Sequence, residues 1–70
     1  MDTYEVVGCW FRHYKDGLYK VIGEVIHTET KEKLVTYEDQ YAVLWARPKE
    51  MFFGKVIVDG KEIKRFTKID

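Results

Sequence analysis

The segment Trp45-Ala46-Arg47-Pro48 is the part of the sequence best suited to bind a ligand. On a β-strand, Trp45 and Arg47 share one face and stand about 6–7 Å apart. At that spacing the guanidinium can stack on the indole. The pattern predicts an aromatic–arginine platform of the kind that binds bases, phosphorylated groups or peptides. The structural alternative places Trp45 in the core and pairs Arg47 with Glu50 or another acid.

A second candidate group lies near the N-terminus, at Arg12-His13-Tyr14. Strand alternation puts Arg12 and Tyr14 on one face and His13 on the other. His13 is either a structural histidine that donates to a backbone carbonyl or, with Arg12, part of the lining of a pocket. The candidate binding residues are therefore Arg12, His13, Tyr37, Tyr41, Trp45 and Arg47.

Metal and covalent chemistry find little support in the sequence. Cys9 and His13 are four residues apart, about 13 Å on an extended strand, whereas zinc ligands must lie within about 2.3 Å of one ion. The chain contains no serine, Cys9 lies in an apolar run that lowers its reactivity, and the glycines are too scattered for a phosphate-binding loop. We expect no catalytic residue, no metal site and no cofactor.

Composition favours one small folded domain over residues 1–70, with 46% hydrophobic, 16% aromatic and 34% charged residues. Twelve basic residues balance twelve acidic ones, which lowers the expectation of nucleic-acid binding without excluding it. The Met-Asp-Thr start lacks a basic segment followed by an apolar one, and no apolar run reaches the roughly 20 residues that span a bilayer. With one cysteine, these features predict a cytoplasmic protein without membrane contact, as a monomer or weak homodimer.

The elements that must position the candidate residues are short strands. Asp16-Gly17 and Asp59-Gly60 each predict a tight hairpin, and Gly23 inside a long apolar strand predicts a bulge or bend. Pro48 ends a strand and should begin one helical turn over residues 48–53, whose apolar side chains plug the fold. The expected strands cover residues 6–14, 18–28, 33–38, 43–47, 55–58 and 61–66. This is an all-β, five- to six-stranded SH3-like barrel.

Several ordered segments carry a family resemblance. They include residues 11–15, 19–23, 27–30, 34–37, 44–48 and 58–61. Their order resembles the bacterial domain of unknown function 1653 family over about residues 8–66. The resemblance implies a small β-barrel-like domain and supplies no activity. Members often carry a glycine-rich loop before the Trp-x-Arg-Pro segment, whereas residues 39–43 here contain no glycine.

These features favour a non-catalytic binding or adaptor module, in which an aromatic–arginine groove takes a peptide, nucleotide or nucleic-acid segment. A small enzyme or enzyme accessory domain would use His13, or alternatively His27, as an acid–base group. A purely structural or oligomerising role is the third alternative.

Overall fold

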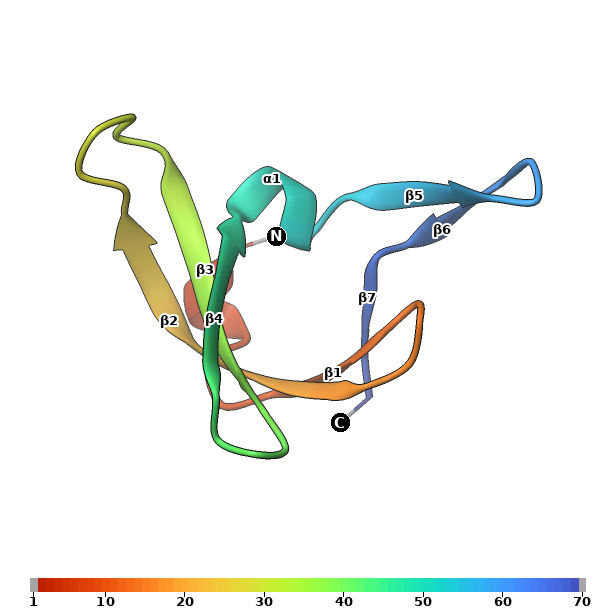
Figure 1. The fold of residues 1–70 in the computed structure, drawn as a ribbon, viewed down its shortest axis with the longest axis horizontal. Coiled ribbons are helices and arrows are strands. Elements are labelled where there is room, and N and C mark those ends of the chain that lie inside the picture. The colour runs from red at the N-terminus through yellow and green to blue at the C-terminus, as the bar shows by residue number, and fades with distance from the viewer. Residues whose placement is uncertain (1, 70) are drawn as a thin grey trace.

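The computed structural model describes residues 2–69 and contains seven strands, one short 3₁₀ helix and one helical turn (Figure 1). The elements in chain order are η1 (Thr3–Glu5), β1 (Trp10–His13), β2 (Leu18–Ile26), β3 (Lys33–Asp39), β4 (Leu44–Pro48), α1 (Lys49–Phe52), β5 (Lys55–Val58), β6 (Lys61–Lys64) and β7 (Phe66–Lys68). The all-β class predicted from the sequence is confirmed. Within the described residues, no helix is long and apolar enough to cross a membrane.

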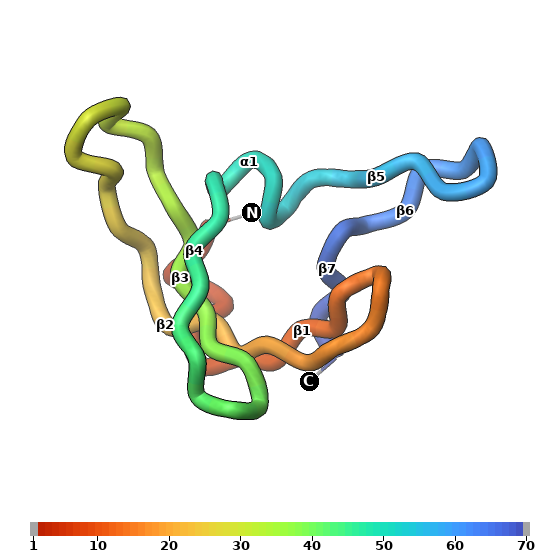
Figure 2. The backbone as a smooth tube through the Cα atoms, viewed as in Figure 1, coloured from red at the N-terminus to blue at the C-terminus, as the bar shows by residue number. Residues whose placement is uncertain are grey.

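Five of the strands form one curved antiparallel sheet in the order β4-β3-β2-β1-β7, and β5 and β6 form a separate hairpin. The edge strands β4 and β7 do not pair with each other, so the barrel is not closed. The backbone tube shows α1 between these two edges and the β5–β6 hairpin projecting outward beyond β7 (Figure 2). The prediction of a barrel therefore needs this correction: side chains of α1, and no backbone ladder, connect the edges.

The bend predicted at Gly23 is present as a β-bulge. The pairing of β2 with β3 shifts between Val21, which faces Tyr37, and Gly23, which faces Thr36. The Thr36 hydroxyl donates to the Gly23 carbonyl at 2.9 Å and holds the bulge. An extra residue in a strand exchanges the two faces. The inner face is thus occupied by Val21 before the bulge and by Glu24 after it, which explains the interrupted apolar alternation of this strand.

Both predicted Asp-Gly hairpins form. Asp16 and Gly17 have φ values of 79° and 100°, and Asp59 and Gly60 have values of 51° and 78°. Val58 and Lys61 pair directly, so Asp59-Gly60 is a two-residue turn, for which positive φ at both residues is typical. The first hairpin has a longer loop: the Asp16 N–H donates to the His13 carbonyl, and the His13 N–H donates to the Gly17 carbonyl.

Several element boundaries differ from the prediction. The first strand begins at Trp10 because residues 6–9 form a turn, in which the Cys9 N–H donates to the Val6 carbonyl. Before this turn, η1 holds a fully buried Thr3, which donates to Glu24 Oε1 at 2.8 Å. The helical turn begins at Lys49, with Pro48 as the last residue of β4. The predicted strand 61–66 is divided at Arg65, whose N–H donates to the Gly54 carbonyl.

Because the predicted last strand is divided at Arg65 into β6 and β7, the described chain has seven strands and not the five or six predicted. The carbonyl of Arg65 accepts from the Tyr14 N–H, so the chain leaves β5 and turns to pair with β1. As a consequence, Phe66 enters the interior at the first position of β7.

Phe52 of α1 is the plug of the fold. It is fully buried and stacks on Phe66, with ring centroids 4.2 Å apart and an interplanar angle of 16°. It also contacts Phe11 edge-on at 5.3 Å and Tyr37 at 5.3 Å. The core comprises Val6, Phe11, Val21, Val35, Tyr37, Phe52 and Phe66.

Replacing Phe52 by Ala should therefore unfold most of the protein. The change removes about 3–5 kcal/mol from a domain of the size whose total stability is about 5 kcal/mol. Urea denaturation followed by tryptophan fluorescence measures this loss. Met51→Ala on the exposed side of the same turn is the control, and an equal loss in both variants would contradict the assignment of Phe52 as the plug.

Candidate functional site

Six side chains on the inner face of the five-stranded sheet line a cavity of about 150 Å³: His13, Tyr19, Tyr37, Trp45, Arg47 and Phe66. We call this cavity the aromatic–arginine pocket. It includes four of the six residues singled out from the sequence. The pocket lies next to the hydrophobic core, and Tyr37 and Phe66 are members of the core as well as of the pocket lining.

The strand register explains why these residues meet. Residues that face each other across a ladder point to the same side of a sheet. Trp45 of β4 faces Tyr37 of β3, and His13 of β1 faces Phe66 of β7. Tyr19 of β2 joins the two groups, because its ring lies edge-on to Tyr37 at 5.4 Å and to Phe66 at 5.8 Å.

Arg47 supplies a positive charge to this aromatic surrounding. The centre of its guanidinium lies 5.6 Å from the Phe66 ring centroid, and its Nη1 atom is buried without a hydrogen-bond partner. Within residues 2–69, no carboxylate lies within ion-pair distance of Arg47, so the alternative pairing with Glu50 is not formed. The phenol of Tyr37 has a raised pKa because it is buried, and the nearby Arg47 charge partly opposes that rise.

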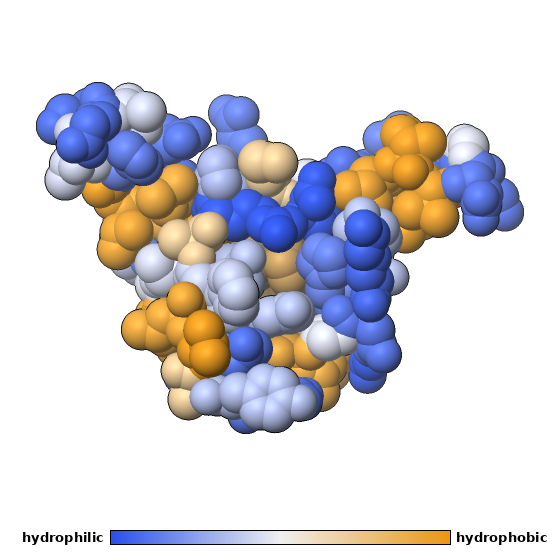
Figure 3. Space-filling view, viewed as in Figure 1, coloured by the Kyte–Doolittle hydropathy of each residue, from blue (hydrophilic) through white to orange (hydrophobic). Residues whose placement is uncertain are grey.

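Arg65 adds a second guanidinium near the pocket from the bend between β6 and β7. Its Nε atom is also buried without a hydrogen-bond partner. Its charge acts on both His13 and Tyr37. In the part of the chain that the structure describes, it too lacks an ion-pair partner. The β2–β3 and β5–β6 hairpins project from the molecule, and the face between them shows hydrophilic atoms, with apolar atoms on both hairpins (Figure 3).

His13 is held by its Nδ1 atom, which accepts from the Lys15 backbone N–H at 3.2 Å. The direction is opposite to the expected donation to a carbonyl. In the neutral ring the proton is then on Nε2, which leaves a donor free for a ligand. Burial lowers the pKa of His13, and the positive charges of Arg47, Arg65 and Lys15 lower it further.

Trp45 forms the rim of the pocket. Its side chain is half exposed, at 51%, so the alternative that it is a core residue is not what the structure shows. Its Nε1–H donates to Asp39 Oδ2 at 3.0 Å, and Asp39 Oδ1 accepts from the N–H groups of Tyr41 and Val43. The hydrogen bond from Trp45 and those from the two amides lower the pKa of Asp39. Asp39 therefore closes the β3–β4 turn and fixes the orientation of the indole.

Arg12 and Tyr41 lie outside the pocket. Arg12 faces Leu18 and Thr67 on the outer side of the sheet, where its Nη1 forms an exposed ion pair with Asp16 at 3.0 Å. Tyr41 is 76% exposed in the β3–β4 turn. Arg12 nevertheless lines a second, open cavity of about 200 Å³ together with His13, Tyr14, Ile63, Lys64 and Thr67.

Sequence reasoning missed Tyr19, Phe66, Asp39 and Arg65 as parts of this region. An exposed indole N–H favours a nearby acceptor, so Asp39, at the end of the preceding strand, was a findable partner for Trp45. Tyr19 could be found from its alternation with Val21. Phe66 and Arg65 could not, because their positions depend on the division of the last predicted strand.

His27 and Cys9, the other two residues considered from the sequence for chemistry, lie outside the aromatic–arginine pocket, and His27 has the Glu29 carboxylate 3.6 Å from its Nδ1. His27 lies beyond the far end of β2, where its Nδ1 accepts from the backbone N–H groups of Glu29 and Thr30. Cys9 packs against the core. Among residues 2–69, no three His, Cys, Asp or Glu side chains are grouped closely enough to hold a metal ion.

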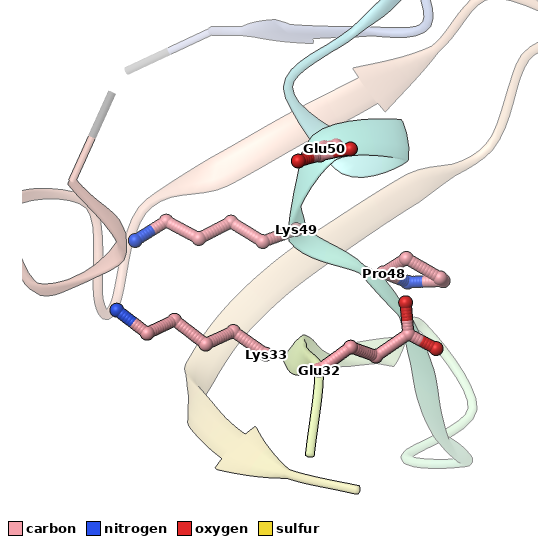
Figure 4. Close-up of a pocket in the computed structure, with 5 residues that line it drawn as sticks. All are labelled: Glu32, Lys33, Pro48, Lys49 and Glu50. Atoms are coloured by element: carbon pink, nitrogen blue, oxygen red, sulfur yellow. The ribbon is translucent and has the colours of Figure 1, made fainter. Parts of the chain in front are cut away.

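A larger surface cavity of about 230 Å³ lies between the start of β3 and α1, and it is lined by Glu32, Lys33, Pro48, Lys49 and Glu50 (Figure 4). Its two acids and two lysines offset each other in charge. Lys49 is moreover bonded to Glu24 Oε1 at 3.0 Å. No aromatic side chain lines it, so it is a weaker candidate than the aromatic–arginine pocket.

The electrostatic description of the pocket predicts the titration of His13. Its pKa should lie below the ordinary value for histidine, and Arg47→Gln should raise it because one of the opposing charges is removed. Following the imidazole Hε1 resonance against pH by NMR measures both values. Arg12→Gln on the outer face should leave the His13 pKa unchanged; a shift equal to that of Arg47→Gln would contradict the proposed local field.

Comparison with known proteins gives the family of the chain and no activity. No curated protein matches the sequence. A crystal structure of a DUF1653 protein from Bordetella bronchiseptica is similar in fold, with a TM-score of 0.79 and 24% sequence identity over 97% of this chain and 92% of that one. The family model described as "Protein of unknown function (DUF1653)" matches residues 8–68. The chain therefore belongs to the DUF1653 family.

Proposed function

We propose that this domain is a non-catalytic binding module whose aromatic–arginine pocket takes a ligand with a negatively charged group beside a planar or apolar one. The observation that carries the proposal is the Arg47 guanidinium, partly buried among aromatic rings without a carboxylate partner in the described chain.

The energetic argument concerns the missing counter-charge. Removing an ion from water costs several kcal/mol unless it is paired or hydrogen-bonded. The cation–π contact between Arg47 and Phe66 returns about 0.5–2 kcal/mol, and a hydrogen bond with the Tyr37 phenol satisfies part of the guanidinium, but Nη1 stays without a partner. A ligand anion would supply the remaining interactions, since a guanidinium presents a planar fork that matches carboxylate and phosphate oxygens.

A binding role is favoured over catalysis by the way the titratable groups are engaged. The Nδ1 atom of His13 is occupied by a backbone N–H, and the Asp39 carboxylate is occupied by Trp45 and two amides. A general base needs a free acceptor within reach of the substrate proton. Within residues 2–69, the lining of the pocket contains no carboxylate to fill that role.

The proposal is tested with a ¹⁵N-labelled NMR screen of peptides, nucleotides and short oligonucleotides. A ligand should shift the amide resonances of β4, β7 and the His13 region. Arg47→Gln should weaken its binding by about tenfold or more, because a charge-assisted hydrogen bond contributes about 1.5–3 kcal/mol. The spectrum of the free variant should remain that of a folded protein.

Arg12→Gln is the matched control, because it removes the same charge from the outer face of the sheet. It should leave the affinity within about twofold, as expected for an exposed ion pair. The proposal is wrong if the shifted amides surround Arg12 in place of Arg47, or if Arg47→Gln unfolds the domain and no ligand is found.

A further inference from the structure

Two guanidinium groups border the pocket: Arg47 lies in its wall, and Arg65 directly precedes the lining residue Phe66. The acid at the rim, Asp39, is already engaged by the Trp45 indole and by two backbone N–H groups. The rings of Tyr14 and Tyr19 pack against the His13 imidazole. A carboxylate carries one negative charge, whereas a phosphate monoester carries about 1.5 to 2 at pH 7.

The dimensions of the pocket suit the same group. The pocket volume of about 150 Å³ has room for more than one water molecule and for a small anionic group such as a phosphate. Any larger part of the ligand must then extend past the rim, where the half-exposed Trp45 presents its ring.

The spacing of Trp45 and Arg47 separates the two parts of the ligand. Positions two apart on a strand are about 6–7 Å apart. A phosphate on Arg47 and a ring stacked on Trp45 therefore need a spacer between them. In a nucleoside monophosphate the sugar is this spacer, whereas in phosphotyrosine the phosphate is bonded directly to the ring oxygen.

From this charge, volume and spacing we infer that the pocket binds a nucleoside monophosphate, with the phosphate at Arg47 and the base stacked on Trp45. The inference rests on the proposed function and names its ligand class. The phosphate monoester belongs either to a free nucleotide or to the end of a nucleic-acid strand. A strand bound along its backbone is disfavoured, because that mode uses a basic groove and this protein has no net charge.

The test is a calorimetric titration of the intact protein with AMP, adenosine and inorganic phosphate at pH 7.5 and low salt. AMP should bind about tenfold or more tightly than adenosine, because adenosine lacks the charge-assisted bonds to Arg47. It should also bind about tenfold or more tightly than inorganic phosphate, because phosphate lacks the base that stacks on Trp45. Equal affinity for AMP and adenosine would overturn the inference.

Two variants separate the two halves of the ligand. Trp45→Leu should weaken AMP to about the affinity of phosphate and leave phosphate binding unchanged, while Tyr41→Leu, an exposed aromatic outside the pocket, should change neither. Arg47→Gln should weaken both AMP and phosphate by about tenfold or more. If Trp45→Leu has no effect on AMP, the stacked base is excluded.

The pKa of His13 in the unmodified protein gives a second test, which does not depend on whether a variant folds. A bound phosphate offsets the positive charges around His13, so AMP should shift the His13 pKa upward, and adenosine should not. AMP binding without a change in the His13 pKa would place the phosphate elsewhere and overturn the inference.

Further ligands in the same titration identify the molecule that carries the phosphate. A 5′-phosphorylated trinucleotide that binds as tightly as AMP supports a strand end, and weaker binding supports a free nucleotide. Equal affinity of the unphosphorylated trinucleotide, or tighter binding of a phosphotyrosine peptide, overturns the inference. If only a peptide carboxylate binds at Arg47, the proposed binding function stands and the inference of a nucleotide ligand is wrong. If no anion binds at Arg47, the proposed function and the inference are both wrong.

Discussion

The stacked rings of Phe52 and Phe66 join two edges of the sheet that no backbone ladder connects. Phe52 follows β4 by one helical turn, and Phe66 is the first residue of β7. Since β4 and β7 are the two edges, this contact determines how far the curved sheet opens. The other constraint is the bulge in β2, which bends the sheet so that the two edges approach each other.

The same contact creates the pocket, because fold and site share their rings. The Phe66 ring stacks on Phe52 and also lies under the Arg47 guanidinium. Tyr37 likewise contacts Phe52 in the core and Tyr19 in the pocket. A wall built from core residues has little freedom to move, so a ligand would meet a preformed surface, which reduces the entropy lost on binding.

Much of this arrangement could be predicted from the sequence, and the rest depended on contacts between distant segments. The strand alternation of Trp45 and Arg47, the two Asp-Gly turns and the bend at Gly23 are local patterns. The partners of Arg47 are not, because they follow from the pairing of β7 with β1. In the sequence, Arg65 is indistinguishable from its strand neighbours. Only its backbone hydrogen bonds with Gly54 and Tyr14 show that the chain passes from one sheet to the other at this residue.

We propose that a ligand anion completes the Arg47 guanidinium, which has no ion-pair partner within residues 2–69. Urea denaturation of Arg47→Met without ligand tests it most directly, since methionine keeps an unbranched apolar stem and removes the charge. Taking a charge out of water without a partner is costly, so replacing the partly buried Arg47 guanidinium by an apolar side chain should not destabilise the fold. We predict that the free energy of unfolding stays equal or rises; a fall of more than about 1 kcal/mol would show that the charge stabilises the fold and contradict the account.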